Sequence, residues 1–124
     1  MPELSRLQGR RILFAEDDYF IVTNMVSYFR GEGAEIAGPA ARLQAALQIA
    51  KTEPLDGAVL DVDLRGESSL PIAQALLQRR IPFVFVTGYD AGMLPQPFTE
   101  APSCQKPTRP ELVADKLLSI MPRT

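Results

Sequence analysis

The sequence predicts an α/β protein built on a doubly wound, parallel, five-stranded sheet. Short apolar runs rich in β-branched residues alternate with segments whose apolar residues recur at helical spacing. Such alternation favours parallel strands joined by right-handed crossovers, with helices on both faces of the sheet. Acidic, hydroxyl and basic residues follow several of the runs. Because ligand sites of such sheets lie at the carboxyl ends of the strands, we expect the chemistry at that rim.

The composition limits the classes of function. A chain of 124 residues is expected to form one domain. Its 13 basic and 15 acidic residues leave a net charge of −2, which gives no electrostatic reason to expect nucleic-acid binding. The absence of histidine excludes histidine bases and histidine metal ligands. A single cysteine, Cys104, together with the lack of a long apolar run or a signal peptide, predicts a cytoplasmic protein without membrane insertion.

Five short segments, most of them apolar, are the expected strands. They cover residues 11–15, 34–37, 58–63, 83–87 and 103–105. The central run is too short for a helix, and its apolar part ends on Asp61, with Asp63 two positions later. The expected strand order is 2-1-3-4-5, which makes the first and third strands neighbours.

The first two helices have recognisable boundaries. The first is expected to begin at Tyr19 and to stop at Gly31 or Gly33, since glycine commonly ends a helix. The second follows an expected turn at Gly38-Pro39 and stops before Pro54. Their inward-facing residues are expected to be Ile21, Val22, Met25, Val26 and Phe29, followed by Leu43, Ala46, Leu47 and Ala50.

The later helices are less uniform. Ser68 or Ser69 can cap a third helix with Pro71 in its first turn, and Thr108-x-x-Glu111 reads as a capping box for the last one. Between the fourth and fifth strands, prolines argue against a regular helix, so we expect a short or irregular fourth helix with a turn or two near Asp90–Leu94. Inward-facing residues are expected to be Ile72, Ala75 and Leu76, followed by Val113, Leu117 and Ile120.

Reactive side chains gather at the strand ends. Glu16 and Asp17 follow the first strand, Asp61 ends the third, Thr87 ends the fourth and Lys106 follows the fifth. Two unit charges ~4 Å apart repel by about 4 kcal/mol at an effective dielectric constant of ~20, so clustered carboxylates need a compensating cation. Mg²⁺ suits carboxylates, waters and phosphate oxygens, with Mn²⁺ as the alternative ion. A hydroxyl and an ammonium suit phosphoryl oxygens, and an aspartate can act as a nucleophile towards phosphorus.

This set of residues resembles the receiver domain of two-component response regulators. The resemblance spans nearly the whole chain, in order, and implies a flavodoxin-like (βα)5 fold. It implies one receiver domain over residues 1–124, with its core at about 10–122 and no output domain. The implied partners are a sensor histidine kinase or a histidine phosphotransferase, together with a downstream protein that receives the signal by direct contact.

The resemblance also assigns roles to residues. Asp61 would accept a phosphoryl group, Thr87 would bind the phosphoryl oxygens and Lys106 would pair with them. Glu16, Asp17, Asp61 and the backbone carbonyl of Asp63 would hold Mg²⁺. Such a domain takes up phosphate from donors and slowly loses it, so it is not a turnover enzyme. A cis peptide bond between Lys106 and Pro107 is also implied.

A narrower resemblance involves the fourth strand. The segment Pro82–Tyr89 is similar to the Phe-Ala-Thr-Gly-x-Tyr signature of a receiver subfamily, which is commonly single-domain, alphaproteobacterial and paired with HWE-type histidine kinases. Val86 replaces the alanine of the signature, and Asp90 stands at its tyrosine position. Ser103 stands where many receivers carry an aromatic switch residue. A ring swinging inward from that position is therefore excluded, and we expect segment 89–102 to transmit the change.

Two alternatives remain open at this level. Asp61-Val-Asp63 also resembles the nucleophile motif of haloacid-dehalogenase-like, Mg²⁺-dependent phosphatases. Those enzymes need an acidic pair after the lysine, and here only Glu111 and Asp115 follow it, within the expected last helix. The other alternative is a pseudo-receiver, a binding module that is never phosphorylated.

Overall fold

The architecture is a five-stranded parallel sheet between two helical layers. The computed structural model describes residues 5–88, 94–95 and 97–122. The sheet order is β2-β1-β3-β6-β7, and all of its strand pairs are parallel. Its strands are β1 (Arg11–Ala15), β2 (Glu35–Ala40), β3 (Gly57–Asp61), β6 (Phe83–Thr87) and β7 (Ser103–Gln105). Because β6 and β7 are the fourth and fifth expected strands, the predicted order 2-1-3-4-5 is confirmed.

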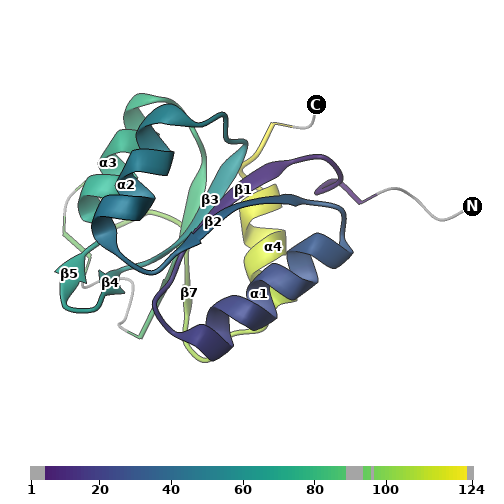
Figure 1. Cartoon of the computed structure of the whole chain (residues 1–124), viewed down its shortest axis with the longest axis horizontal. Helices are drawn as coiled ribbons and strands as arrows, with labels where there is room; N and C mark the ends of the chain where they lie inside the picture. The colour runs from purple at the N-terminus through teal and green to yellow at the C-terminus, as the bar shows by residue number, and fades with distance from the viewer. Residues whose placement is uncertain (1–4, 89–93, 96, 123–124) are drawn as a thin grey trace, which may run out of the picture.

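Four helices among the described residues cover the sheet. They are α1 (Tyr19–Gly31), α2 (Leu43–Thr52), α3 (Leu70–Gln78) and α4 (Pro110–Leu118). Figure 1 shows α2 and α3 on one side of the sheet, with α1 and α4 on the other. Both faces of the central strands are therefore buried, and every residue of β3 and β6 is inaccessible or nearly so.

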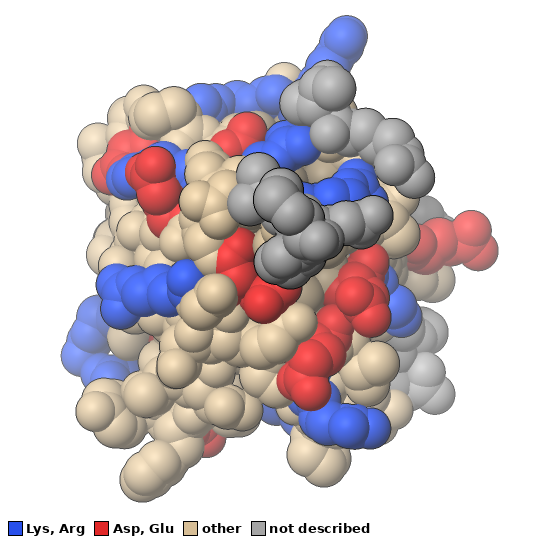
Figure 2. Space-filling view, turned by 90° about the vertical axis from the view of Figure 1, so that its right-hand side faces the viewer, with Lys and Arg blue, Asp and Glu red and all other residues tan. Residues whose placement is uncertain are grey.

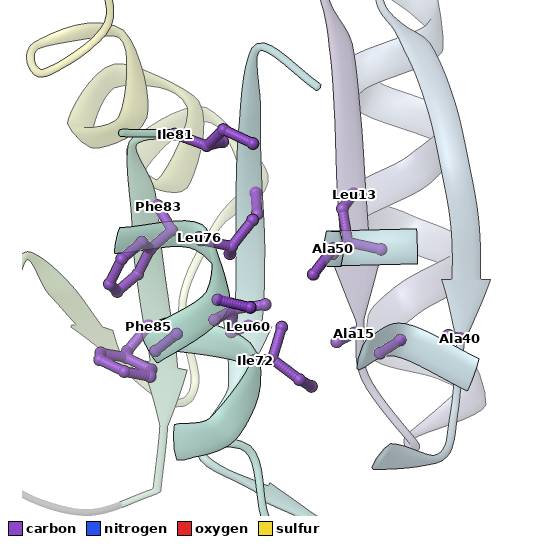
Figure 3. Packing of buried hydrophobic residues seen from close by; sticks show 14 of the residues in the cluster. Leu13, Ala15, Ala40, Ala50, Leu60, Ile72, Leu76, Ile81, Phe83 and Phe85 are labelled. Carbon is purple, nitrogen blue, oxygen red and sulfur yellow. The ribbon is translucent and has the colours of Figure 1, made fainter. Parts of the chain in front are cut away.

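Alternating strand residues form two separate cores. Leu13, Leu60 and Phe85 face α2 and α3, where they meet Ile72 and Leu76 (Figure 3). The next residues along the same strands belong to the second cluster, which packs against α1 and α4 and comprises, among others, Ile12, Phe14, Val59, Val84 and Val86. This period-two alternation holds the strands rigidly, so the residues at their carboxyl ends occupy fixed positions.

The second strand is longer than the sequence predicts. The expected turn at Gly38-Pro39 is wrong, since β2 continues through both residues to Ala40. Two features make this possible. β2 lies at the edge of the sheet, where proline is tolerated, and its register with β1 shifts between Leu13 and Ala15. Gly38 also has a φ of +89°, which a residue with a side chain rarely adopts.

Two helix-end predictions are also corrected. α4 begins at Pro110 after Arg109, and Thr108 lies outside it, so the predicted capping box is wrong. Ile120 lies beyond the helix and is 39% exposed, whereas Met121 is buried in its place. At the end of α1, Gly33 rather than Gly31 has the left-handed backbone, with a φ of +91°.

A small hairpin follows the central strand and was not predicted. β4 (Asp63–Leu64) pairs antiparallel with β5 (Glu67–Ser68), next to the carboxyl end of β3.

Most of the expected turn near Asp90–Leu94 lies outside the described residues. Phe98 anchors the described part of segment 94–102, since its ring packs 5.9 Å from that of Phe85 and 6.2 Å from that of Phe83.

The surface carries mixed charge. On the face in Figure 2, Lys and Arg side chains are interspersed with Asp and Glu side chains. Arg11 illustrates the pattern, since its guanidinium pairs with Glu53 and also lies 3.8 Å from Glu35. No helix in the described part of the chain has the length and apolar character needed to cross a membrane.

Candidate functional site

The sheet brings the five predicted site residues to its carboxyl rim. Glu16 and Asp17 follow β1 directly, Asp61 is the last residue of β3, and Thr87 is the last residue of β6. Lys106 follows β7, and its backbone N–H donates to the carbonyl oxygen of Thr87 at 2.7 Å. Because β1, β3, β6 and β7 are consecutive neighbours in the sheet, their ends share one rim.

Three carboxylates form the centre of this site. One oxygen from each of Glu16, Asp17 and Asp61 lies within 4.8 Å of the other two. The Nζ atom of Lys106 lies 2.9 Å from Oδ2 of Asp61 and 3.2 Å from Oε1 of Glu16. Glu16 and Asp61 are only 6% and 7% exposed, so water screens this cluster weakly.

Burial and crowding shift the protonation of the site. The pKa of Glu16 is raised from 4.5 to about 8, mainly by burial and then by the hydrogen bond with Asp61. The backbone N–H of Asp18 and the charge of Lys106 oppose this rise without cancelling it. The pKa of Lys106 is raised as well, because its interactions with Asp61 and Glu16 outweigh the opposing effect of its own burial.

Backbone N–H groups donate hydrogen bonds to three of the aspartate carboxylates at this rim. Oδ2 of Asp17 accepts a hydrogen bond from the Arg65 N–H at 3.0 Å. Oδ1 of Asp61 accepts from the Asp63 N–H at 3.2 Å, and the exposed Asp63 carboxylate accepts from the Gly66 N–H at 3.4 Å. Sequence reasoning missed the contact of Arg65 with Asp17, because Gly66 signals a turn but not which residue the turn contacts.

Neighbouring residues have structural roles. Asp18 is the N-cap of α1, since its Oδ1 accepts from the N–H groups of Phe20 and Ile21 at 3.0 and 3.1 Å. Asp18 therefore stabilises the start of the helix and is not one of the three clustered carboxylates. Cys104 is buried in β7, and the Lys106–Pro107 peptide bond is cis, as the resemblance implied.

The donor set fits a hard divalent cation. Mg²⁺ and related ions take carboxylate oxygens in preference to nitrogen or sulfur ligands, and three carboxylates converge here from two neighbouring strands. The pKa of Glu16 is raised mainly by burial and then by its hydrogen bond with Asp61. A bound cation would favour the charged form of this carboxyl, so the residues present suit an ion of this class.

Comparisons with known proteins agree with this arrangement. No protein-family model matches the sequence. The transcriptional regulatory protein PdtaR of Mycobacterium tuberculosis is 28% identical over 112 residues, which cover 90% of this chain and 55% of PdtaR. The chain therefore spans about half the length of the curated relatives it matches.

Two solved structures are also similar to this chain. SdrG from Sphingomonas melonis Fr1 is 34% identical, with a TM-score of 0.78, over 94% of this chain and 98% of SdrG. The response regulator PhyR from Brucella abortus is 25% identical, with a TM-score of 0.75, over 94% of this chain and 49% of PhyR. The sheet order, the rim of carboxylates and lysine, and these similarities lead to one conclusion. The chain belongs to the receiver domains of two-component response regulators.

Proposed function

We propose that this protein is a phosphoacceptor signalling switch, in which Asp61 receives a phosphoryl group in a Mg²⁺-dependent reaction. One observation carries the proposal: the Lys106 ammonium lies 2.9 Å from the Asp61 carboxylate, inside a cluster of three acids. A lone carboxylate at a strand end would be an ordinary surface group. An aspartate that pairs with a lysine and lies beside two further acidic side chains is arranged for phosphoryl chemistry.

The transfer would use each residue in a distinct way. An Asp61 carboxylate oxygen forms a bond to phosphorus while the phosphorus–nitrogen bond of the donor's phosphohistidine breaks, and the imidazole leaves. Glu16, Asp17, Asp61 and the Asp63 backbone carbonyl would hold the Mg²⁺. When bound, the ion neutralises charge on the phosphoryl oxygens. Lys106 is already beside Asp61 and would pair with a phosphoryl oxygen after transfer.

Thr87 completes the proposed set. It is 1% exposed at the end of β6, and its carbonyl oxygen is bound to the Lys106 N–H. A shift of the Thr87 hydroxyl towards a new phosphoryl oxygen would therefore be felt by Lys106 and the adjoining β7. We propose this as the first step of output, with segment 89–102 as the reader. Residues 89–93 and 96 of that segment, including the signature positions Tyr89 and Asp90, lie outside the described residues, so subfamily membership stays a prediction.

The alternatives have weaker support. A haloacid-dehalogenase-like phosphatase needs acids after the lysine, yet Glu111 and Asp115 are exposed on α4 and are not members of the carboxylate cluster. A pseudo-receiver would not need a cluster of this kind. Receiver domains are generally not turnover enzymes, and we propose that this one only takes up a phosphoryl group and slowly loses it.

The donor is proposed to be a histidine kinase or a histidine phosphotransferase. Tyr19 and Phe20 open α1, directly after the acidic rim, and are 72% and 83% exposed. Their rings contact each other edge to face, with centroids 5.7 Å apart. An exposed aromatic pair beside a recessed nucleophile gives a donor protein an apolar surface on which to dock.

Mass spectrometry after incubation with Mg²⁺ and acetyl phosphate tests the proposal. A switch gains one phosphoryl group per chain, and Asp61→Asn abolishes the gain. Rapid consumption of the donor with little adduct would instead identify a phosphatase. Neither adduct nor turnover would identify a pseudo-receiver and would overturn the proposal.

A further inference from the structure

We propose that the backbone N–H of Arg65, presented by the β4–β5 hairpin, is a positioning group that orients Asp17 towards the cation. The hairpin would then help to set the Mg²⁺ affinity of the site. This inference rests on the proposed function, because it assumes that Asp17 is a Mg²⁺ ligand. It concerns a contact that joins residues 48 positions apart in the sequence.

Asp17 differs from the other two carboxylates in how it is held. Lys106 forms ion pairs with both Glu16 and Asp61. Among the described residues, Asp17 forms no ion pair, and its Oδ2 instead accepts from the Arg65 N–H at 3.0 Å. The orientation of Asp17 therefore depends on the hairpin, which belongs to a different part of the chain from β1.

The hairpin presents that N–H in a defined direction. Asp63 pairs with Ser68 and Leu64 with Glu67, which leaves Arg65 and Gly66 as a two-residue turn. Their φ values are +52° and +86°, the signs required at both central positions of a type I′ turn. Leu64 is fully buried and anchors the hairpin.

The Asp63 carboxylate accepts from the Gly66 N–H at 3.4 Å and so closes the same turn. Arginine seldom adopts a positive φ, whereas glycine does so readily. The turn is therefore maintained by its surroundings, which include the hydrogen bond to Asp17.

A carboxylate has two oxygens, so both contacts can exist together. Oδ2 accepts from Arg65, and Oδ1 is left to bind a cation in the cluster. Groups that hydrogen-bond to a metal ligand fix its orientation, and their loss typically weakens metal affinity about 10–100-fold. By thermodynamic linkage, a bound cation must stabilise the hairpin turn by the same factor.

The experiment compares two matched glycine substitutions. Gly66 and Gly9 both have positive φ, +86° and +75°, and an added Cβ would meet nothing within 4 Å at either. Gly66→Val disturbs the hairpin, whereas Gly9→Val applies the same backbone strain in the segment before β1, outside the site. Mg²⁺ binding to each variant is measured by isothermal titration calorimetry, with circular dichroism to verify folding.

We expect Gly66→Val to bind Mg²⁺ about 10–100-fold more weakly than the wild type, and Gly9→Val to bind like the wild type. Equal affinity of a folded Gly66→Val and the wild type would overturn the inference. Failure of the wild type itself to bind Mg²⁺ would instead refute the proposed function.

Hydrogen exchange gives a second measurement that requires no hairpin variant. The Arg65 amide of the wild type should exchange more slowly when Mg²⁺ is added, and faster in Asp17→Ala. An Arg65 amide whose exchange is unaffected by either change would show that the hairpin and the cation site are uncoupled. That result would overturn the inference while leaving phosphorylation of Asp61 untouched.

Discussion

The Nζ atom of Lys106 lies 2.9 Å from Oδ2 of Asp61 and 3.2 Å from Oε1 of Glu16, so one ammonium group pairs with two buried acidic side chains. The site has two proposed tasks, which are to bind Mg²⁺ and to respond to phosphorylation, and Lys106 belongs to the second. The lysine contributes no metal ligand, yet it is the cation nearest to the proposed phosphoacceptor. Changes at Lys106 should therefore affect the response to phosphorylation more than the binding of Mg²⁺.

Lys106→Ala is expected to keep Mg²⁺ binding and to fail to switch. Loss of the ammonium removes the proposed partner of the phosphoryl oxygens but leaves all three carboxylates in the sequence. Calorimetric Mg²⁺ titration and the amide NMR spectrum before and after phosphorylation provide the measurement. Loss of Mg²⁺ affinity in this variant would contradict the role given to Lys106, and Lys116→Ala, on α4, is the matched control.

Mg²⁺ binding is expected to depend on pH through Glu16. The metal-free protein holds a proton on this group up to a pKa of about 8, and the cation must displace that proton. Affinity should rise about tenfold per pH unit below pH 8 and level off above it. Glu16→Gln should bind more weakly and lose the slope, and a wild-type affinity that is constant between pH 6 and about 8 would contradict the assignment.

The same group affects stability with a definite sign. The pKa of Glu16 is about 8 in the folded protein and 4.5 as its ordinary value, so the folded state binds the proton more tightly. The resulting contribution to the free energy of unfolding is fully present below pH 4.5 and is lost as pH rises through 8. Urea unfolding of the metal-free protein across this window should show that decline, and Glu16→Gln should reduce it.

The exposed rings of Tyr19 and Phe20 should affect the rate of phosphorylation only when the phosphodonor is a protein. Tyr19→Ser combined with Phe20→Ser is expected to lower kcat/KM for phosphotransfer from a cognate kinase by about tenfold or more, because exposed aromatics contribute strongly at interfaces. Phosphorylation by acetyl phosphate should stay at the wild-type rate. Leu112→Ser, at a residue that is 52% exposed on α4, is the control for removing apolar surface elsewhere.

The ring of Phe98 should hold the segment before β7 in place. It is 3% exposed and contacts Phe83 and Phe85, which belong to the core beside α3. Phe98→Ala is expected to lower the free energy of unfolding by about 3–5 kcal/mol, as for other buried aromatics. Urea denaturation measures the change. A loss near that of the exposed Phe20→Ala would show that the segment is not part of the core.

The strands were predictable because their side chains alternate between two buried faces. Runs such as Phe83–Thr87 combine β-branched and aromatic residues in a length that suits a strand, and all of this strand is buried. The order of acidic and basic residues after the strands predicts that Glu16, Asp61 and Lys106 lie at one rim of the sheet. Local pattern was sufficient there, because parallel strands bring their carboxyl ends together.

Other features depend on contacts that no local pattern records. Gly38-Pro39 looks like a turn, but the edge position of β2 and its shifted register with β1 allow the strand to continue. Thr108 and Glu111 match a capping box, yet the N-cap is Arg109 and the helix begins one residue later than such a box requires. The hairpin that follows β3 is stabilised partly by Asp17, a residue far away in sequence.

The burial of Cys104 makes its thiol a natural probe of the edge of the sheet. The residue is 8% exposed in β7, a strand of three residues that pairs with β6 on one side and leads directly to Lys106. Burial slows the reaction of this thiol with a modifying reagent, and any opening of the edge exposes it further. The alkylation rate of the unmodified protein would therefore rise with the frequency at which β7, the strand that leads to Lys106, separates from the sheet, and no engineered label would be needed.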